Sequence, residues 1–403
     1  MNSIKSPSLN IAYCLIQFIY WTCGCIAIGF ASAFLGKIGY SNSSIGLISA
    51  ISSVLGFILM LSVSQHVDKN GGHAVYSSLM TGISVQAAAL LLVFIIRIPC
   101  IAVSISYIVF MSITHIINTL ISKLYMDLKE IGFEINFGIA RGLGSLGYAM
   151  TSIFAGSLLM SIHPIFMLFI CLCLFLILLS ISLYIRKNAL AQYNIISAPG
   201  CVKRADGLSL SNFIMSYKSF VFLVIGISLV SASNKTLTVF LVNIVDGVGG
   251  NARHFGIISA YLALIEVPVS FLFSNLKKRY SVSLLLFFSM VFYTLKITGY
   301  TFAGSFGVLI AASSLQAFST GIYQPSAVEY VRENIPYNST ALAQSLMTGL
   351  PLLFSFISTV VFGFLLDKFS VSHVLPFTML LAILGTAICL VCLLNRKKPR
   401  QNN

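Results

Sequence analysis

An arginine in a strongly apolar stretch of the chain is the first candidate for chemistry. The stretch runs from Asn136 to Gly156, contains Arg141 near its start, and carries small residues every three or four positions. This spacing places the small residues on one helical face, where a neighbouring helix can approach closely in lipid. A guanidinium is costly inside a membrane and normally faces a wet interior. Arg141 therefore either reaches the cytoplasmic headgroups from a helix end or lies on the wall of a polar substrate pathway.

One carboxylate, Glu266, lies deep in an apolar segment, whereas the other acidic residues lie in or near predicted loops. An unpaired carboxylate in such surroundings readily binds a proton. A group that binds and releases a proton is what a proton-coupled carrier needs. The alternative is a structural ion pair of Glu266 with Lys296 or Lys235, and the two interpretations are compatible.

Two segments, 231–238 and 313–324, combine many polar side chains with an apolar background. They supply amide, ammonium and hydroxyl groups from Asn234, Lys235, Gln316, Ser319 and Tyr323. An isolated serine in a membrane helix often bonds to its own backbone. Runs of this density, with amides and a lysine, indicate a water-lined surface. The single tryptophan, Trp21, is either an interior aromatic or a platform for a stacked solute ring.

The composition defines the kind of element that must position these groups. The 403-residue chain is 58% hydrophobic and 8% charged, with a mean hydropathy of +0.96. A soluble protein of this length carries far more charge, so we expect a polytopic membrane protein. At about 20 apolar residues a span, the chain accommodates about twelve helices, and strands of a barrel would show alternation instead. The cysteines form no cluster with histidines, so no metal, cofactor or disulfide framework is predicted.

Twelve apolar segments predict an all-α polytopic membrane protein with twelve transmembrane helices in two six-helix bundles. The segments are residues 9–36, 43–66, 73–96, 99–126, 136–161, 164–186, 216–245, 252–275, 281–303, 305–331, 338–366 and 370–395. The longest polar interruption separates six helices from six. We therefore expect an N-terminal bundle over 1–186, a cytoplasmic central loop over 187–215, and a C-terminal bundle over 216–403.

The positions of the 24 Lys and Arg residues predict the orientation in the membrane. With the N-terminus in the cytoplasm, most of them fall in inside loops, and those in outside loops are Lys37, Arg97, Arg253 and Lys368. This bias predicts an even number of spans, with both termini on the cytoplasmic side of the plasma membrane. It also accounts for most of the net charge of +14, so no nucleic-acid partner is expected.

Two six-helix halves joined by a basic loop imply two bundles with a cavity between them. That arrangement resembles the major facilitator superfamily. Asp68-Lys69, which follows the second predicted helix, is similar to the superfamily's Gly-x-x-x-Asp-Lys loop, with Ser64 at the glycine position.

The region around Arg141 resembles the lactose-permease-like branch of that superfamily, which includes oligosaccharide, phenylpropionate and nucleoside symporters. The matching residues are Phe137-Gly138-Ile139-Ala140-Arg141, followed by Gly144-Ser145-Leu146-Gly147-Tyr148. The resemblance implies that Arg141 holds sugar hydroxyls and that Tyr148 stacks on the sugar ring. It also makes Ser145, between them, a candidate for solute binding.

Several positions differ from that family's pattern. Lys123 stands where the sugar symporters have a glutamate, and Asp127, one turn later, is the acid that can take its place as a charge partner. Lys296 stands where the family has an arginine. The family's coupling residues in the tenth helix are replaced by Ser313, Gln316 and Ser319. Glu266 lies about one turn from the family's helix 8 carboxylate and is the surviving candidate for proton coupling.

The leading hypothesis is a secondary active transporter that moves a small polar solute, a sugar, by alternating access, coupled to protons through Glu266. Its candidate substrate-binding residues are Arg141, Ser145, Tyr148, Asn234, Lys296, Gln316, Ser319 and Tyr323, with Lys123, Asp127 and Lys235 as charge partners. Because cations outnumber deep carboxylates, an organic-anion transporter is the alternative. A membrane-embedded enzyme or sensor is more distant, since no nucleophile–base pair is evident. The expected partners are the solute, the lipid bilayer and a proton.

Overall fold

The computed structural model describes residues 7–394 except 30, 32–33, 36–37, 41, 97, 162–163, 197–207, 251 and 367. In this part of the chain, eleven helices are long and apolar enough to cross a membrane. A further helix, α6 (Phe137–Ser161), covers the remaining predicted span. The predicted all-α polytopic fold class is therefore confirmed.

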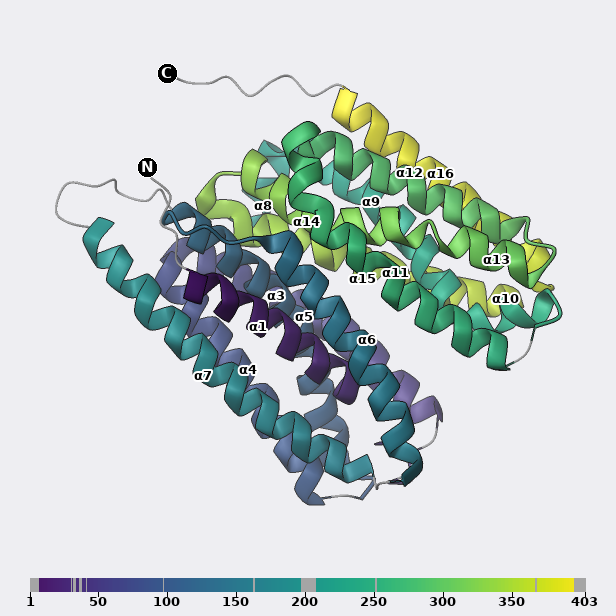
Figure 1. The fold of residues 1–403 in the computed structure, drawn as a ribbon, viewed down its shortest axis with the longest axis horizontal. Coiled ribbons are helices and arrows are strands. Elements are labelled where there is room, and N and C mark those ends of the chain that lie inside the picture. Colours follow the sequence, from purple (N-terminus) through teal and green to yellow (C-terminus); the bar gives the residue numbers. More distant parts are fainter. Residues whose placement is uncertain are drawn as a thin grey trace. The chain divides into compact units, whose positions relative to one another are not determined.

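The first half of the chain forms long helices (Figure 1). They are α1 (Pro7–Gly24) with a π-helical turn η1 (Cys25–Gly29), α3 (Asn42–Asn70), α4 (Gly72–Ile96), α5 (Ile101–Glu130), α6, and α7 (Pro164–Ile196). Helix α7 continues ten residues beyond the predicted boundary at 186. The reason is local, because residues 187–196 contain alanine, leucine and glutamine and no glycine or proline that would end a helix.

The second half contains more interruptions than the sequence pattern predicts. Its elements are α8 (Leu210–Ser216), α9 (Lys218–Val239), α10 (Leu241–Gly247), α11 (Ala252–Arg279), α12 (Val282–Thr301), α13 (Phe306–Ser313), α14 (Gln316–Asn334), η2 (Tyr337–Ser339), α15 (Thr340–Leu366) and α16 (Val371–Leu394). The predicted helices 216–245 and 305–331 are each divided, at Phe240 and at Ser314–Leu315. At the second division the backbone makes tighter bonds, since Leu315 donates to the Ala312 carbonyl and Ala317 to the Ser314 carbonyl.

The chain forms two compact units. Unit 1 contains Met1–Leu208, Ser270–Ser274 and Val331–Ser345, and unit 2 contains Ser209–Val269, Asn275–Tyr330 and Leu346–Asn403. Helices α11, α14 and α15 therefore contribute residues to both units.

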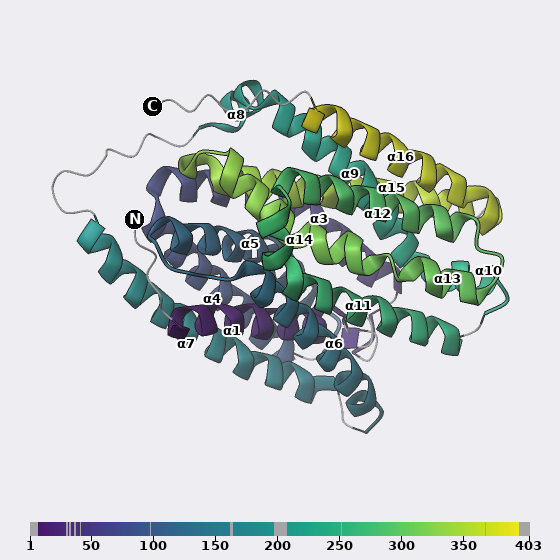
Figure 2. The ribbon, with the colours of Figure 1, turned by 45° about the horizontal axis from the view of Figure 1, so that its top comes forward.

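In unit 1, α1 packs along α6 and α7, and α5 packs along α3 and α4, as both ribbon views show (Figures 1 and 2). Glycines on α6 permit close approaches. A Cβ on Gly147 would lie 2.9 Å from the Phe18 carbonyl oxygen of α1, and one on Gly138 would lie 2.8 Å from the Ser270 carbonyl oxygen. Small residues on α6 are thus required by packing, as is usual where membrane helices associate.

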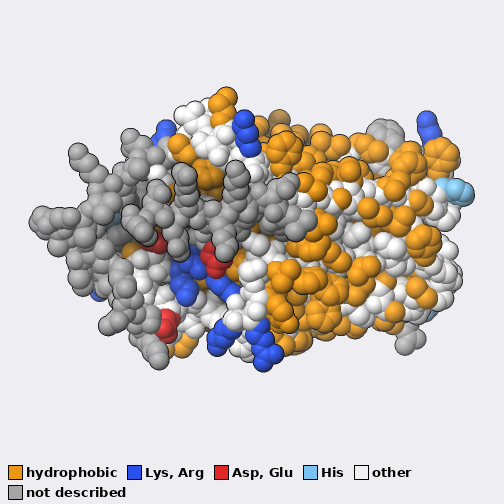
Figure 3. All heavy atoms as spheres, turned by 90° about the horizontal axis from the view of Figure 1, so that it is seen from above, with side chains coloured by type: hydrophobic (Ala, Val, Ile, Leu, Met, Phe, Trp, Pro, Cys, Tyr) orange, Lys and Arg blue, Asp and Glu red, His pale blue; other side chains and the backbone are white. Residues whose placement is uncertain are grey.

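In unit 2, α9 packs along α16, and α16 along α12. The backbones of α9 and α16 come so close at Gly226 and Gly385 that a Cβ on Gly385 would lie 2.5 Å from the Gly226 carbonyl oxygen. Phe222, Phe288 and Leu380 remain exposed on α9, α12 and α16. Figure 3 shows hydrophobic side chains covering a broad part of one face of the molecule, as a surface in contact with lipid requires.

Candidate functional site

A buried lysine is the centre of a polar cluster in unit 2. Lys296 lies on α12 and is only 3% exposed. Its ammonium donates to Asn234 Oδ1 on α9 at 2.5 Å and to Gln316 Oε1, at the start of α14, at 2.6 Å. Three separate helices therefore direct polar groups to one point. These contacts satisfy the ammonium with charge-assisted hydrogen bonds, which an isolated buried cation would lack.

Aromatic and acidic groups complete the surroundings of Lys296. Its Nζ lies 5.8 Å from the centroid of the Tyr293 ring and 6.0 Å from that of Tyr300. The carboxylate of Glu266, half-buried on α11, also acts electrostatically on this ammonium. Such a cluster can bind a hydroxylated solute, because it combines amides, an ammonium, a carboxylate and tyrosine rings.

The other candidates in unit 2 have different positions. Ser319 is fully buried and donates to the Gln316 carbonyl of its own helix at 3.3 Å, so it supports the local backbone. Tyr323 is buried, and its ring packs edge-on against Tyr293 at 6.1 Å, which connects it with the cluster. Lys235, beside Asn234 on α9, is exposed in the protein.

Arg141 is the centre of a second cluster, in unit 1. Arg141 is 8% exposed. Its Nη1 donates to Ser145 Oγ at 2.7 Å, and the guanidinium carbon lies 4.4 Å from the centroid of the Trp21 ring. Ser145 is one turn from Arg141 on α6, as their spacing of four predicts. Tyr148 is half-buried on the same helix. The ring of Trp21 on α1 lies against the guanidinium, a contact that the resemblance to sugar symporters does not indicate.

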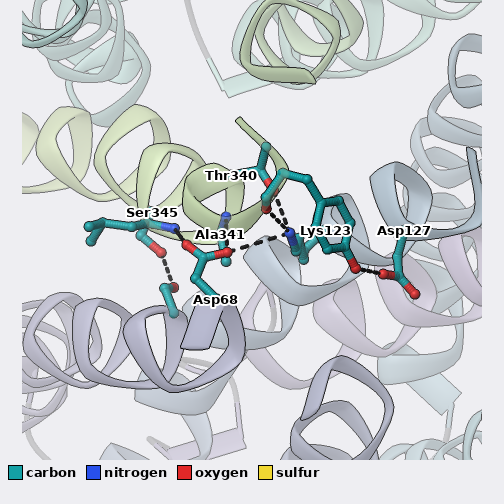
Figure 4. Close-up of polar contacts among 9 residues, drawn as sticks. Asp68, Lys123, Asp127, Thr340, Ala341 and Ser345 are labelled. Atoms are coloured by element: carbon teal, nitrogen blue, oxygen red, sulfur yellow. Dashed lines mark hydrogen bonds and ion pairs between the residues drawn. The ribbon is translucent and has the colours of Figure 1, made fainter. Parts of the chain in front are cut away.

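A third cluster in unit 1 is ionic and almost dry (Figure 4). Lys123 on α5 lies 3.4 Å from Asp68 on α3, and each side chain is 1% exposed. The ammonium also donates to the Tyr337 carbonyl oxygen at 2.8 Å and to the Thr340 hydroxyl. Lys123 thus forms an ion pair with Asp68, whereas Asp127 accepts hydrogen bonds from the hydroxyls of Tyr76 and Tyr337.

Asp68 also caps a helix. Its two carboxylate oxygens accept from the backbone N–H groups of Ala341 at 3.0 Å and Leu342 at 2.8 Å, in the first turn of α15. These N–H groups have no partner within the helix, and the positive end of the helix dipole favours an anion there. One turn before Asp68 on α3, the Ser64 hydroxyl bonds to that of Ser345. Ser64, which stands where the superfamily's loop has a glycine, therefore has the Ser345 hydroxyl as its partner.

Sequence reasoning missed two features of these clusters. The role of Asp68 depends on residues more than 270 positions away and on backbone N–H groups, which no side-chain pattern reveals. The surroundings of Trp21 are indicated by the sequence, since Tyr13, Gln17 and Trp21 are spaced four residues apart and share one face of α1.

Comparison with known proteins now identifies the class. The chain matches the model of the MFS_1 like family over residues 8–352. It therefore belongs to this family of the major facilitator superfamily, and it is a multi-pass membrane transporter rather than an enzyme. The predicted superfamily is confirmed. Among curated proteins, none matches the sequence.

Solved structures of transporters share the fold. A bacterial homologue of the iron transporter ferroportin, in an outward-facing state, has a TM-score of 0.72 at 14% identity, covering 96% of this chain and 99% of that chain. The major facilitator transporter FucP in the outward conformation has a TM-score of 0.69 at 14% identity, covering 95% and 98%. The nucleoside transporter NupG has a TM-score of 0.63 at 14% identity, covering 95% and 99%.

Proposed function

We propose that this protein is a secondary active transporter of a small hydroxylated solute, a sugar, in the plasma membrane. It has both termini in the cytoplasm, and alternating access involves the halves 1–186 and 216–403, joined by the segment 187–215. The observation that carries the proposal is the Lys296 cluster. Its ammonium binds one amide oxygen from α9 and one from α14. Hydroxyl groups of the solute can replace these two oxygens as hydrogen-bond partners of Lys296. The amides of Asn234 and Gln316 can then bind the solute themselves.

The Arg141 cluster supports the same proposal. Its guanidinium, the Ser145 hydroxyl and the Trp21 ring combine donors, an acceptor and an aromatic face. Sugar binding requires this combination, because a pyranose has hydroxyls around its edge and an apolar face. The transporters FucP and NupG have the same fold, and one structure of FucP names it a fucose:proton symporter.

Proton coupling through Glu266 is the second part of the proposal. Glu266 is half-buried on a predicted transmembrane helix and acts electrostatically on Lys296. Protonation of Glu266 removes its negative charge, which leaves the ammonium more available to a solute. Proton binding and solute binding at unit 2 are thereby linked.

An organic anion is the second candidate solute. The hydrogen bonds described for Lys296 and Arg141 go to neutral amide and hydroxyl oxygens. A carboxylate or phosphate of the solute can therefore bind either cation with a stronger, charge-assisted bond. The same clusters then serve an acidic solute.

Purified protein in liposomes tests both candidates with one matched pair of hexoses. D-Glucose and D-glucuronate differ in charge at one carbon, and uptake of each is measured against protein-free liposomes. Saturable uptake of D-glucose supports the sugar, and selective uptake of D-glucuronate supports the anion. A panel of neutral pentoses and hexoses and their acids, none of which is moved or exchanged, would overturn both candidates.

A further inference from the structure

Trp21 lies under the Arg141 guanidinium and is itself held by two residues of its own helix. The indole Nε1 donates to Gln17 Oε1 at 3.1 Å, and Gln17 Nε2 donates to the Tyr13 hydroxyl at 3.2 Å. The Tyr13 hydroxyl then donates to the Ile121 carbonyl oxygen of α5 at 3.1 Å. A continuous series of hydrogen bonds therefore runs from the backbone of α5 to the indole.

Most members of this series are buried. Tyr13 has no exposed surface and Gln17 is 3% exposed, whereas Trp21 is half-buried. Glutamine within an apolar helix is costly unless both ends of its amide are bonded. Here its oxygen accepts from Trp21 and its nitrogen donates to Tyr13. The orientation of the amide thus follows from Tyr13, and the orientation of the indole follows from the amide.

Helix α6 is shaped to receive the indole. A Cβ on Gly144 would lie 2.6 Å from Trp21 Cδ1 and 3.2 Å from its Nε1. Any other residue at this position would push the ring away. Gly144 is three residues from Arg141, so the same turn of α6 both supplies the guanidinium and accepts the ring edge.

We propose that Trp21, oriented by Gln17 and Tyr13, is the positioning residue for Arg141: its ring face holds the guanidinium in the orientation that binds the solute. The inference rests on the proposed function for the role of Arg141 in binding, and it adds the determinant of that residue's geometry. A ring face attracts a guanidinium by about 0.5–2 kcal/mol, depending on desolvation, and fixes its plane. Without the ring, Arg141 adopts other rotamers and loses side-chain entropy when solute binds.

The first test needs no solute, because Trp21 is the only tryptophan in the chain and its emission reports this site alone. Emission spectra of the full-length protein in detergent are compared for wild type, Arg141→Met, Gln17→Met and Tyr13→Phe. We expect each variant to shift the emission maximum. The matched control is Tyr107→Phe, since Tyr107 is also a buried tyrosine of unit 1 whose hydroxyl donates to a backbone carbonyl, that of Ala27, but lies outside the series. Equal spectra for wild type and Arg141→Met, or equal shifts for Tyr13→Phe and Tyr107→Phe, would overturn the positioning role.

The second test measures uptake of D-glucose or D-glucuronate, whichever the wild-type protein takes up. Trp21→Leu is expected to raise KM about twofold to thirtyfold with kcat unchanged, the factor that corresponds to the loss of a cation–π contact. Trp21→Phe, which keeps a ring face, recovers most of this loss, and Gln17→Met raises KM in the same direction. If Trp21→Leu lowers the melting temperature but leaves KM unchanged, Trp21 only packs. If wild type takes up neither compound, the result counts against the proposed function. The emission spectra then decide the positioning role independently.

Discussion

The ammonium of Lys123 lies 3.4 Å from the carboxylate of Asp68, with 1% of each side chain exposed. Taking both charges out of water is costly, and the pair persists because Asp68 has two further backbone donors and Lys123 two further oxygen acceptors. These contacts attach residues 337–342 to α3 and α5 within unit 1. The two charges here compensate each other, whereas the hydrogen bonds described for Lys296 and Arg141 go to neutral amide and hydroxyl oxygens.

Asp68→Asn keeps the shape of the side chain and removes its charge, so it leaves Lys123 buried without this counterion. We expect the free energy of unfolding to fall by about 3–5 kcal/mol, measured by thermal or chemical unfolding in detergent. Asp246→Asn is the matched control, because Asp246 is exposed on α10. An equal loss of stability in both variants would show that the Asp68–Lys123 pair has no special role. The double variant Asp68→Asn with Lys123→Met should recover part of the loss.

Lys296→Met removes the ammonium that joins Asn234 and Gln316 while keeping an unbranched side chain. Loss of charge-assisted hydrogen bonds to the solute is expected to reduce kcat/KM for uptake roughly tenfold to a hundredfold. Lys218→Met, at an exposed lysine at the start of α9, is the control and should keep wild-type uptake. Unchanged uptake by Lys296→Met would remove Lys296 from the solute site.

Glu266→Gln keeps a hydrogen-bonding side chain and cannot release a proton at neutral pH. If Glu266 couples transport to protons, this variant still exchanges labelled for unlabelled solute across liposomes but does not accumulate solute when a pH gradient is imposed. In wild type, a proton ionophore should abolish accumulation and spare exchange. Accumulation by Glu266→Gln at the wild-type level would assign coupling to another group.

Gly385→Ala adds one methyl group where α16 meets α9. Because its Cβ would lie 2.5 Å from the Gly226 carbonyl oxygen and 2.9 Å from Leu229 Cβ, the two helices must separate. We expect a loss of about 1–3 kcal/mol in the free energy of unfolding, read as a lower melting temperature. Gly304→Ala in the same unit has no atom within 4 Å of the added carbon and serves as the control. Equal melting temperatures for the two variants would show that α9 and α16 tolerate the separation.

The fold was accessible from the sequence because long apolar segments leave few alternatives to membrane helices. The predicted helices 73–96 and 370–395, for example, correspond to α4 (Gly72–Ile96) and α16 (Val371–Leu394). The division at Ser314–Leu315 was not predictable, since neither residue is a glycine or proline. Local backbone bonding decides it, and apolar periodicity carries no information about such a change.

The candidate site was predictable in its residue types and less so in its contacts. Asn234, Lys296 and Gln316 stand out because they are polar residues in apolar segments, and the structure brings them into direct contact in unit 2. The partner of Lys123 was not apparent, because Asp68 looks like a loop residue in the sequence but lies buried at the end of α3. The Trp21 contact with Arg141 depends on how α1 packs against α6, which spacing along one helix cannot give.

The division between α13 and α14 makes the two amide partners of Lys296 unequal. Asn234 lies inside α9, five residues before the helix ends, whereas Gln316 is the first residue of α14. A residue at a helix start can turn its side chain or lose one turn of helix at little cost, since its own N–H is not part of the helical ladder. If a solute binds at Lys296 as proposed, we expect it to displace the Gln316 side chain first and to leave Asn234 in place. The conformation of α14 should then change before that of α9.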